Sequence, residues 1–153
     1  WWSNMKKILI LIKIIFICFI FTKTAVAKET IYYKKGKEFF QKKEFDKSKI
    51  LFERDIVFNP KSEKSYLYLA KIFNSNENDL EEEINLNSVL LLNPKNEEAI
   101  YMLVLLKIKQ SDYNQAKELL DRFDLVCQSL CSKKEDIKEK FDKINPENAK
   151  SNN

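Results

Sequence analysis

The sequence predicts an all-α fold for this 153-residue chain. One Gly and three Pro leave few residues suited to the turns of a β-sandwich or barrel, whereas the abundant Lys, Glu, Leu and Ile are compatible with helices. Asn59-Pro60 and Asn93-Pro94 lie 34 residues apart, and each closes a segment with apolar residues at helical spacing. These observations favour a small domain of repeated helix pairs.

The N-terminal residues have the pattern of an export signal. From Met5, the sequence MKKILILIKIIFICFIFTKTAVAKE contains two lysines, an apolar run at residues 8–21 and a small-x-small site at residues 25–27. We therefore predict a signal peptide over residues 5–27, which is cleaved to release a periplasmic or secreted protein.

The alternative is that the N-terminal segment is retained and anchors the protein to the inner membrane. Lys13 interrupts the apolar run, which is also shorter than the roughly 20 residues that span a bilayer. Cleavage is therefore the favoured prediction. Residues 1–4 precede Met5 and are interpreted as an extension outside the native protein.

A step of 34 residues aligns apolar residues with apolar residues. Most members of these columns recur at the spacing of a buried helix face, so we expect Phe39, Phe52, Phe73 and Leu86 to pack between helices. The aligned columns are Tyr32, Tyr66 and Ile100; Gly36, Ala70 and Val104; Phe39 and Phe73; Phe52, Leu86 and Leu120; and Val57, Leu91 and Leu125.

Each 34-residue unit divides into two helices. Polar breaks occur at residues 42–46, 74–79 and 110–112, and an aspartate ends each break. We predict that these aspartates cap the second helices through their side chains, with Glu82 completing a capping box. The three predicted caps are Asp46, Asp79 and Asp112.

Two prolines separate the units. Because proline cannot continue a helix but fits its first turn, Pro60 and Pro94 are predicted to end one helix and to open the next. The predicted units span residues 29–62, 63–96 and 97–130.

These units resemble tetratricopeptide repeats. The resemblance implies a short superhelix of three helix hairpins, and the sequence departs from the family at Glu82, where Ala is preferred. The residues at signature positions are Tyr32, Gly36, Phe39, Phe45, Phe52 and Pro60.

The last repeat needs a cap. Ser132 to Glu135 reads as a capping box, and Ile137, Phe141 and Ile144 follow at helical spacing. A capping helix is therefore predicted over residues 132–144, which completes a repeat domain at 28–144. The polar tail at 145–153 is predicted to be disordered.

Charge and composition argue against several function classes. Four lysines precede residue 28, so the remainder has 27 − 4 = 23 basic residues against 23 acidic residues and lacks the basic stripe that nucleic acids require. The absence of His removes the commonest acid–base catalyst and metal ligand. We predict no enzymatic activity, cofactor, metal or nucleic-acid partner, although carboxylate-only catalysis stays open.

Cys127 and Cys131 lie at the junction between the last repeat and its cap. A disulfide there would fix the cap in an oxidising compartment. The alternatives are a redox pair, which the spacing and lack of nearby His disfavour, and a metal site, for which two thiols supply too few ligands.

The family resemblance implies that the first helices line a concave groove that binds a partner protein or peptide. We predict a non-catalytic interaction module of the bacterial cell envelope, with acidic partner residues near Lys37 and Lys71; a merely solvated face is the alternative. A second possible function is a membrane-anchored structural subunit or assembly factor. The implied groove residues are Tyr33, Lys37, Phe40, Leu67, Lys71, Tyr101, Leu105 and Ile108.

Overall fold

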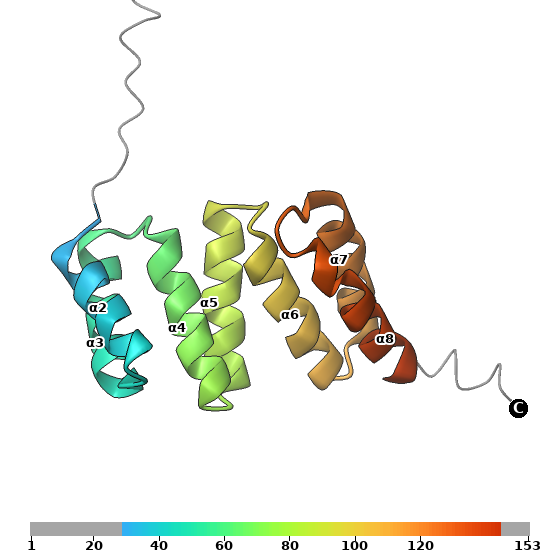
Figure 1. Cartoon of the computed structure of the whole chain (residues 1–153), viewed down its shortest axis with the longest axis horizontal. Helices are drawn as coiled ribbons and strands as arrows, with labels where there is room; N and C mark the ends of the chain where they lie inside the picture. Colours follow the sequence, from blue (N-terminus) through green and yellow to red (C-terminus); the bar gives the residue numbers. More distant parts are fainter. Residues whose placement is uncertain (1–28, 145–153) are drawn as a thin grey trace, which may run out of the picture.

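The computed structural model describes residues 29–144, which form seven α-helices and one 3-10 turn (Figure 1). The all-α prediction is confirmed, since this part of the chain contains no strand. The predicted signal peptide and tail lie outside the described residues. The elements are α2 (Ile31–Gln41), α3 (Phe45–Phe58), α4 (Glu63–Ser75), α5 (Asp79–Leu92), α6 (Glu97–Lys109), α7 (Tyr113–Val126), η1 (Cys131–Lys133) and α8 (Lys134–Ile144).

Consecutive helices pack as antiparallel pairs that stand side by side, and α8 covers the end of the row (Figure 1). The start of α2 and the turns that follow α3, α5 and α7 lie along one edge of the array, which we call the inter-repeat edge. The turns inside each pair lie along the opposite edge. Within residues 29–144, no helix combines the length and apolar character needed to cross a bilayer.

The turn inside each pair has the same backbone conformation. Lys43, Glu77 and Ser111 are 34 residues apart and adopt φ angles of 60°, 55° and 60°. In each turn the next amide donates back to a carbonyl in the last turn of the first helix, which is the Schellman arrangement. The turn therefore repeats without the glycine that usually marks it.

The predicted second-helix caps are correct in one repeat of three. Asp112 caps α7, because its side chain accepts a hydrogen bond from a first-turn amide. Asn78 takes this role in α5, so Asp79 is the first helical residue and its predicted cap is wrong. In α3 the N-cap residue is Glu44, whose side chain makes no capping hydrogen bond. The prediction that Asp46 caps this helix is therefore also wrong.

The prolines and Ser132 do not open helices. Pro60 and Pro94 lie in turns, and the next helices begin three residues later at Glu63 and Glu97. Ser132 lies inside η1, so the predicted capping box is wrong and a 3-10 turn leads directly into α8.

The repeat columns locate most of the core. Phe52, Phe73 and Leu86 are buried as predicted, whereas Phe39 is only half-buried. An aromatic cluster occupies the first repeat and the start of the second, and an aliphatic cluster extends from α4 to α8. The column of Val57, Leu91 and Leu125 is exposed, although its apolar type repeats.

Gly36 occupies a close contact between α2 and α3. A Cβ atom at this position would lie 2.9 Å from the buried Phe52 ring, and the Gly36 carbonyl accepts a hydrogen bond from Ser48 Oγ at 2.8 Å. The lack of a side chain therefore permits both the ring and the hydroxyl to approach the backbone.

Candidate binding groove and the contacts that support it

The first helices of the repeats border a groove of about 310 Å³. Four of the eight predicted groove residues line it: Phe40 from α2, Lys71 from α4, and Tyr101 and Leu105 from α6. The other lining residues are Asn74, Ser75, Glu82, Glu98 and Met102.

The other predicted groove residues lie elsewhere. Tyr33 is only 6% exposed and belongs to the aromatic core, where its ring contacts Phe52, so its assignment as a groove residue is corrected. Burial raises the pKa of Tyr33 to about 12. Leu67 and Ile108 pack partly against the aliphatic cluster, and Lys37 is exposed but does not line the groove.

The groove lysine is already paired. Lys71 Nζ lies 2.7 Å from Glu98 Oε1 and 5.2 Å from the centre of the Tyr68 ring. Its charge is therefore compensated inside the groove. An acidic partner residue near Lys71 would have to compete with this ion pair, so the predicted contact stays a prediction.

Glu82 is the residue that the sequence interpretation missed. It does not complete a capping box; its side chain lies in the groove wall, is 1% exposed, and accepts hydrogen bonds at 3.0 and 3.1 Å from Asn74 Nδ2. Burial raises the pKa of this carboxyl group. The donor is a neutral amide, so no hydrogen-bonded cation lies beside this buried carboxyl group. The departure from Ala at this position was the only sequence signal.

The remaining groove surface is largely apolar. Tyr101 and Met102 are partly exposed next to Leu105, and Phe40 closes the opposite side, where its ring packs edge-on to Tyr68 at 4.9 Å. A largely apolar surface of this kind can accept a segment that presents apolar side chains.

Three glutamates at 34-residue intervals link the start of each repeat to the turn or helix start that follows its second helix. Glu29 Oε1 accepts from Lys64 at 2.7 Å, and Glu63 Oε1 accepts from the side-chain amide of Asn93 at 3.0 Å. Glu97 makes the corresponding link to residues 128–130. We call Glu29, Glu63 and Glu97 the linking glutamates. Their 34-residue spacing is visible in the sequence, although it does not by itself indicate what they bind.

A second carboxylate stabilises the first inter-repeat junction. Asp55 is fully buried and accepts hydrogen bonds from the hydroxyls of Thr30, Ser62 and Ser65, with a distance of 2.5 Å for Ser62. Because a buried carboxylate needs such donors, this cluster fixes the start of α2 and the start of α4 on α3.

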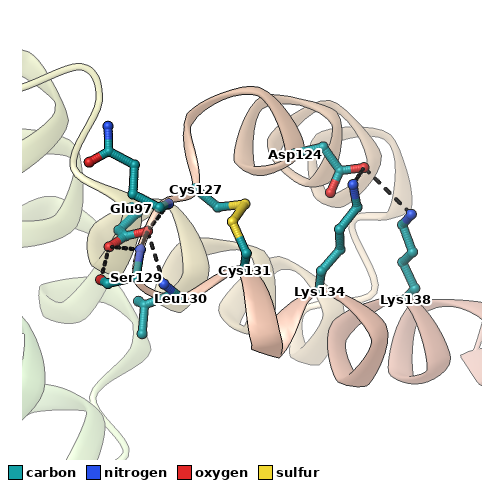
Figure 2. The surroundings of a disulfide bond; sticks show 9 residues. Glu97, Asp124, Cys127, Ser129, Leu130, Cys131, Lys134 and Lys138 are labelled. Atoms are coloured by element: carbon teal, nitrogen blue, oxygen red, sulfur yellow. Dashed lines mark hydrogen bonds and ion pairs between the residues drawn. A yellow bond between two sulfur atoms is a disulfide. The ribbon is translucent and has the colours of Figure 1, made fainter.

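The last junction is held by a covalent bond and by Glu97 (Figure 2). Cys127 and Cys131 form a disulfide with a Cα–Cα distance of 5.2 Å. Glu97 accepts hydrogen bonds from the backbone amides of residues 128–130, which lowers its pKa to about 2. This arrangement fits the structural interpretation of the cysteines.

Asp124 attaches the capping helix to α7. Its Oδ2 atom lies 3.0 Å from Lys134 Nζ and 3.5 Å from Lys138 Nζ of α8 (Figure 2). Within residues 29–144, no group of three or more Cys, Asp or Glu side chains is placed to hold a metal ion. Together with the disulfide, these ion pairs join α7 to the segment that leads into α8 and to α8 itself.

Comparison with known proteins shows the fold but gives no close relative. No family model matches the sequence, and no curated protein matches it. A chain of the CopN-Scc3 complex superposes with a TM-score of 0.62 at 18% identity, covering 76% of this chain and 78% of that one. The Sgt2 TPR domain from Aspergillus fumigatus gives 0.60 at 15% identity and covers 79% of both chains. The described residues therefore have the fold of tetratricopeptide-repeat domains.

Proposed function

We propose that the protein is a non-catalytic interaction module that binds a segment of another protein in the groove between α2, α4 and α6. The observation that carries this proposal is the partly exposed apolar surface of Tyr101, Met102 and Leu105 beside buried Glu82. One similar chain comes from a complex of two named proteins, which supports a binding role.

The groove chemistry favours a partner segment with apolar residues. Its apolar side chains would pack on Tyr101 and Leu105. An acidic partner residue near Lys71 would have to compete with Glu98 for that lysine, whereas Lys37 is exposed.

The proposed location is the bacterial cell envelope, in the periplasm or outside the cell after removal of residues 5–27. The Cys127–Cys131 disulfide supports an oxidising compartment, because such bonds are rare in the cytosol. The alternative is a membrane-anchored subunit or assembly factor that retains the N-terminal segment. Mass spectrometry of the mature N-terminus distinguishes the two, since cleavage leaves Lys28 as the first residue.

Site-specific crosslinking tests the groove. A photoreactive residue at Met102 is expected to capture a partner protein in intact cells, whereas the same residue at exposed Leu80, outside the groove, is not. Leu105→Lys should reduce the capture at Met102 about tenfold or more, because it places a charge among apolar contacts. Leu80→Lys is the matched control and should leave capture unchanged.

Two results would contradict the groove proposal. Equal capture from Met102 and Leu80 would mean that the groove does not select a partner. Undiminished capture by the Leu105→Lys variant would mean that the apolar groove surface does not contribute to binding.

A further inference from the structure

The inter-repeat edge exposes a row of large apolar side chains that the fold does not use. Val57, Leu91 and Leu125 are 73%, 84% and 86% exposed, and they occupy the same position at the ends of α3, α5 and α7. Phe58 is also exposed at this edge, and its ring stacks on Tyr32 at 5.4 Å. Repetition at 34-residue intervals places one such group in every repeat.

The lysines of this edge face solvent, while its carboxylates are hydrogen-bonded within the array. Lys61 and Lys95, again 34 residues apart, are exposed, and their ammonium groups have no bonded partner within residues 29–144. Glu63 and Glu97 are half-buried and accept hydrogen bonds from the inter-repeat turns. Lys61 and Lys95 therefore place positive charges without a bonded partner between the apolar groups.

The N-terminal segment joins the domain at the same edge. Glu29 lies there, bonded to Lys64 at the start of α4, and in the sequence seven residues, 22–28, separate it from the apolar run at 8–21. Seven connecting residues span at most about 25 Å even when fully extended. A chain that retains its apolar run in a bilayer therefore holds the inter-repeat edge close to the lipid headgroups.

We propose that the inter-repeat edge lies on an anionic lipid surface when the N-terminal segment is retained. The apolar row would enter the headgroup region, with the Tyr32–Phe58 pair in the zone that aromatic rings favour, and Lys61 and Lys95 would face anionic headgroups. A second copy of the chain is a poorer occupant, because it would bring these lysines together. The groove residues from α4 and α5 lie at the opposite ends of these helices, whereas Glu98 lies near the edge at the start of α6.

Tryptophan quenching by brominated lipids tests this proposal in the full chain. In a background with Trp1 and Trp2 changed to Phe, Leu91→Trp places a probe on the edge. Leu80→Trp places a matched probe on the same helix, because Leu80 is 69% exposed at the other end of α5. In vesicles of brominated phosphatidylglycerol and phosphatidylcholine, the probe at 91 should be quenched about twofold more than the probe at 80.

Two further experiments test the role of the lysines and exclude a dimer. The Lys61→Gln, Lys95→Gln double variant should lose the extra quenching that phosphatidylglycerol gives over phosphatidylcholine alone. Equal quenching at positions 80 and 91, or quenching that does not respond to lipid charge, would overturn the proposal. It would also be overturned if light scattering in detergent showed a dimer that Leu125→Ser dissociates and the probe at 91 remained unquenched by lipid.

Discussion

The first and last junctions of the array use a carboxylate in opposite ways. Asp55 is fully buried and receives only side-chain hydroxyls, whereas Glu97 lies near the surface and receives backbone amides next to a disulfide. At the positions equivalent to Asp55, the later repeats have buried Val89 and Phe123. The comparison teaches that the fold tolerates either a polar cluster or an apolar contact at one repeat position, provided that every buried polar group has a partner.

The largest effect is expected at the buried carboxylate. Asp55→Ala should lower the free energy of unfolding by about 3 kcal/mol, because Ser62 and Ser65 lose their acceptor and a cavity forms. Urea denaturation followed by circular dichroism measures the loss. Asp55→Asn retains one acceptor oxygen and should cost less.

A double variant sharpens this prediction. Asp55→Val with Ser65→Ala reproduces the Val89 and Ala99 pair of the next junction, and it should recover most of the stability lost in Asp55→Ala. A double variant no more stable than Asp55→Ala would show that the first junction specifically requires its polar cluster.

The disulfide comes next. Replacing Cys127 and Cys131 by Ser should cost about 2 kcal/mol, because the unfolded chain regains the freedom that the short loop removes. Reduction of the native protein should give the same loss in urea denaturation. The double variant is the control, and a further loss when it is treated with the reductant would contradict this explanation.

The Glu97 link should depend on pH. Glu97→Gln is expected to cost about 1 kcal/mol at pH 7, because the charged acceptor of three amides is replaced by a neutral one. Folding lowers the pKa from 4.5 to about 2, so the contribution of the ionised form is complete above about 4.5 and is lost as pH falls towards 2. The stability difference between variant and native protein should therefore narrow between pH 5 and pH 2. A constant difference would exclude this ionisation as the cause.

The smallest changes in stability are expected at the predicted helix caps, and they should distinguish a residue that caps a helix from one that does not. Asp112→Ala should cost about 1 kcal/mol, because α7 loses its side-chain cap. Ser132→Ala should change stability by less than about 0.5 kcal/mol, since this residue lies within η1 and does not cap α8. Thermal denaturation of the two variants side by side compares them, and equal losses would contradict the assignment.

The helix pairs could be predicted because the buried apolar residues that form them recur at a fixed interval in the sequence. The 34-residue interval aligned Phe52 with Leu86 and Leu120, a column that is buried in all three repeats, and this indicated the hairpins. Helix caps were harder, because the choice between Asn78 and Asp79 depends on backbone angles that a short polar segment does not determine.

The groove residues were predicted only in part, because the sequence does not determine which of two adjacent residues on a helix faces the core. Tyr32 and Tyr33 are adjacent, and the rotation of α2 against Phe52 buries the second of them. Glu82 entered the groove because Asn74 supplies its hydrogen bonds from another helix, a contact that no pattern within α5 indicates. The exposed column of Val57 and its equivalents shows that periodic apolar character does not by itself imply burial.

The positions of the linking glutamates set the order in which their hydrogen bonds can form during synthesis. Each of them lies about one unit ahead of its partners in the chain, so a polypeptide that leaves the ribosome from its N-terminus presents the acceptor before the donors. Glu29 can bond once Lys64 has emerged, whereas Glu97 must wait for Leu130. Completion of the domain therefore proceeds towards the C-terminus, and closure of the sulfur bridge belongs to its final stage.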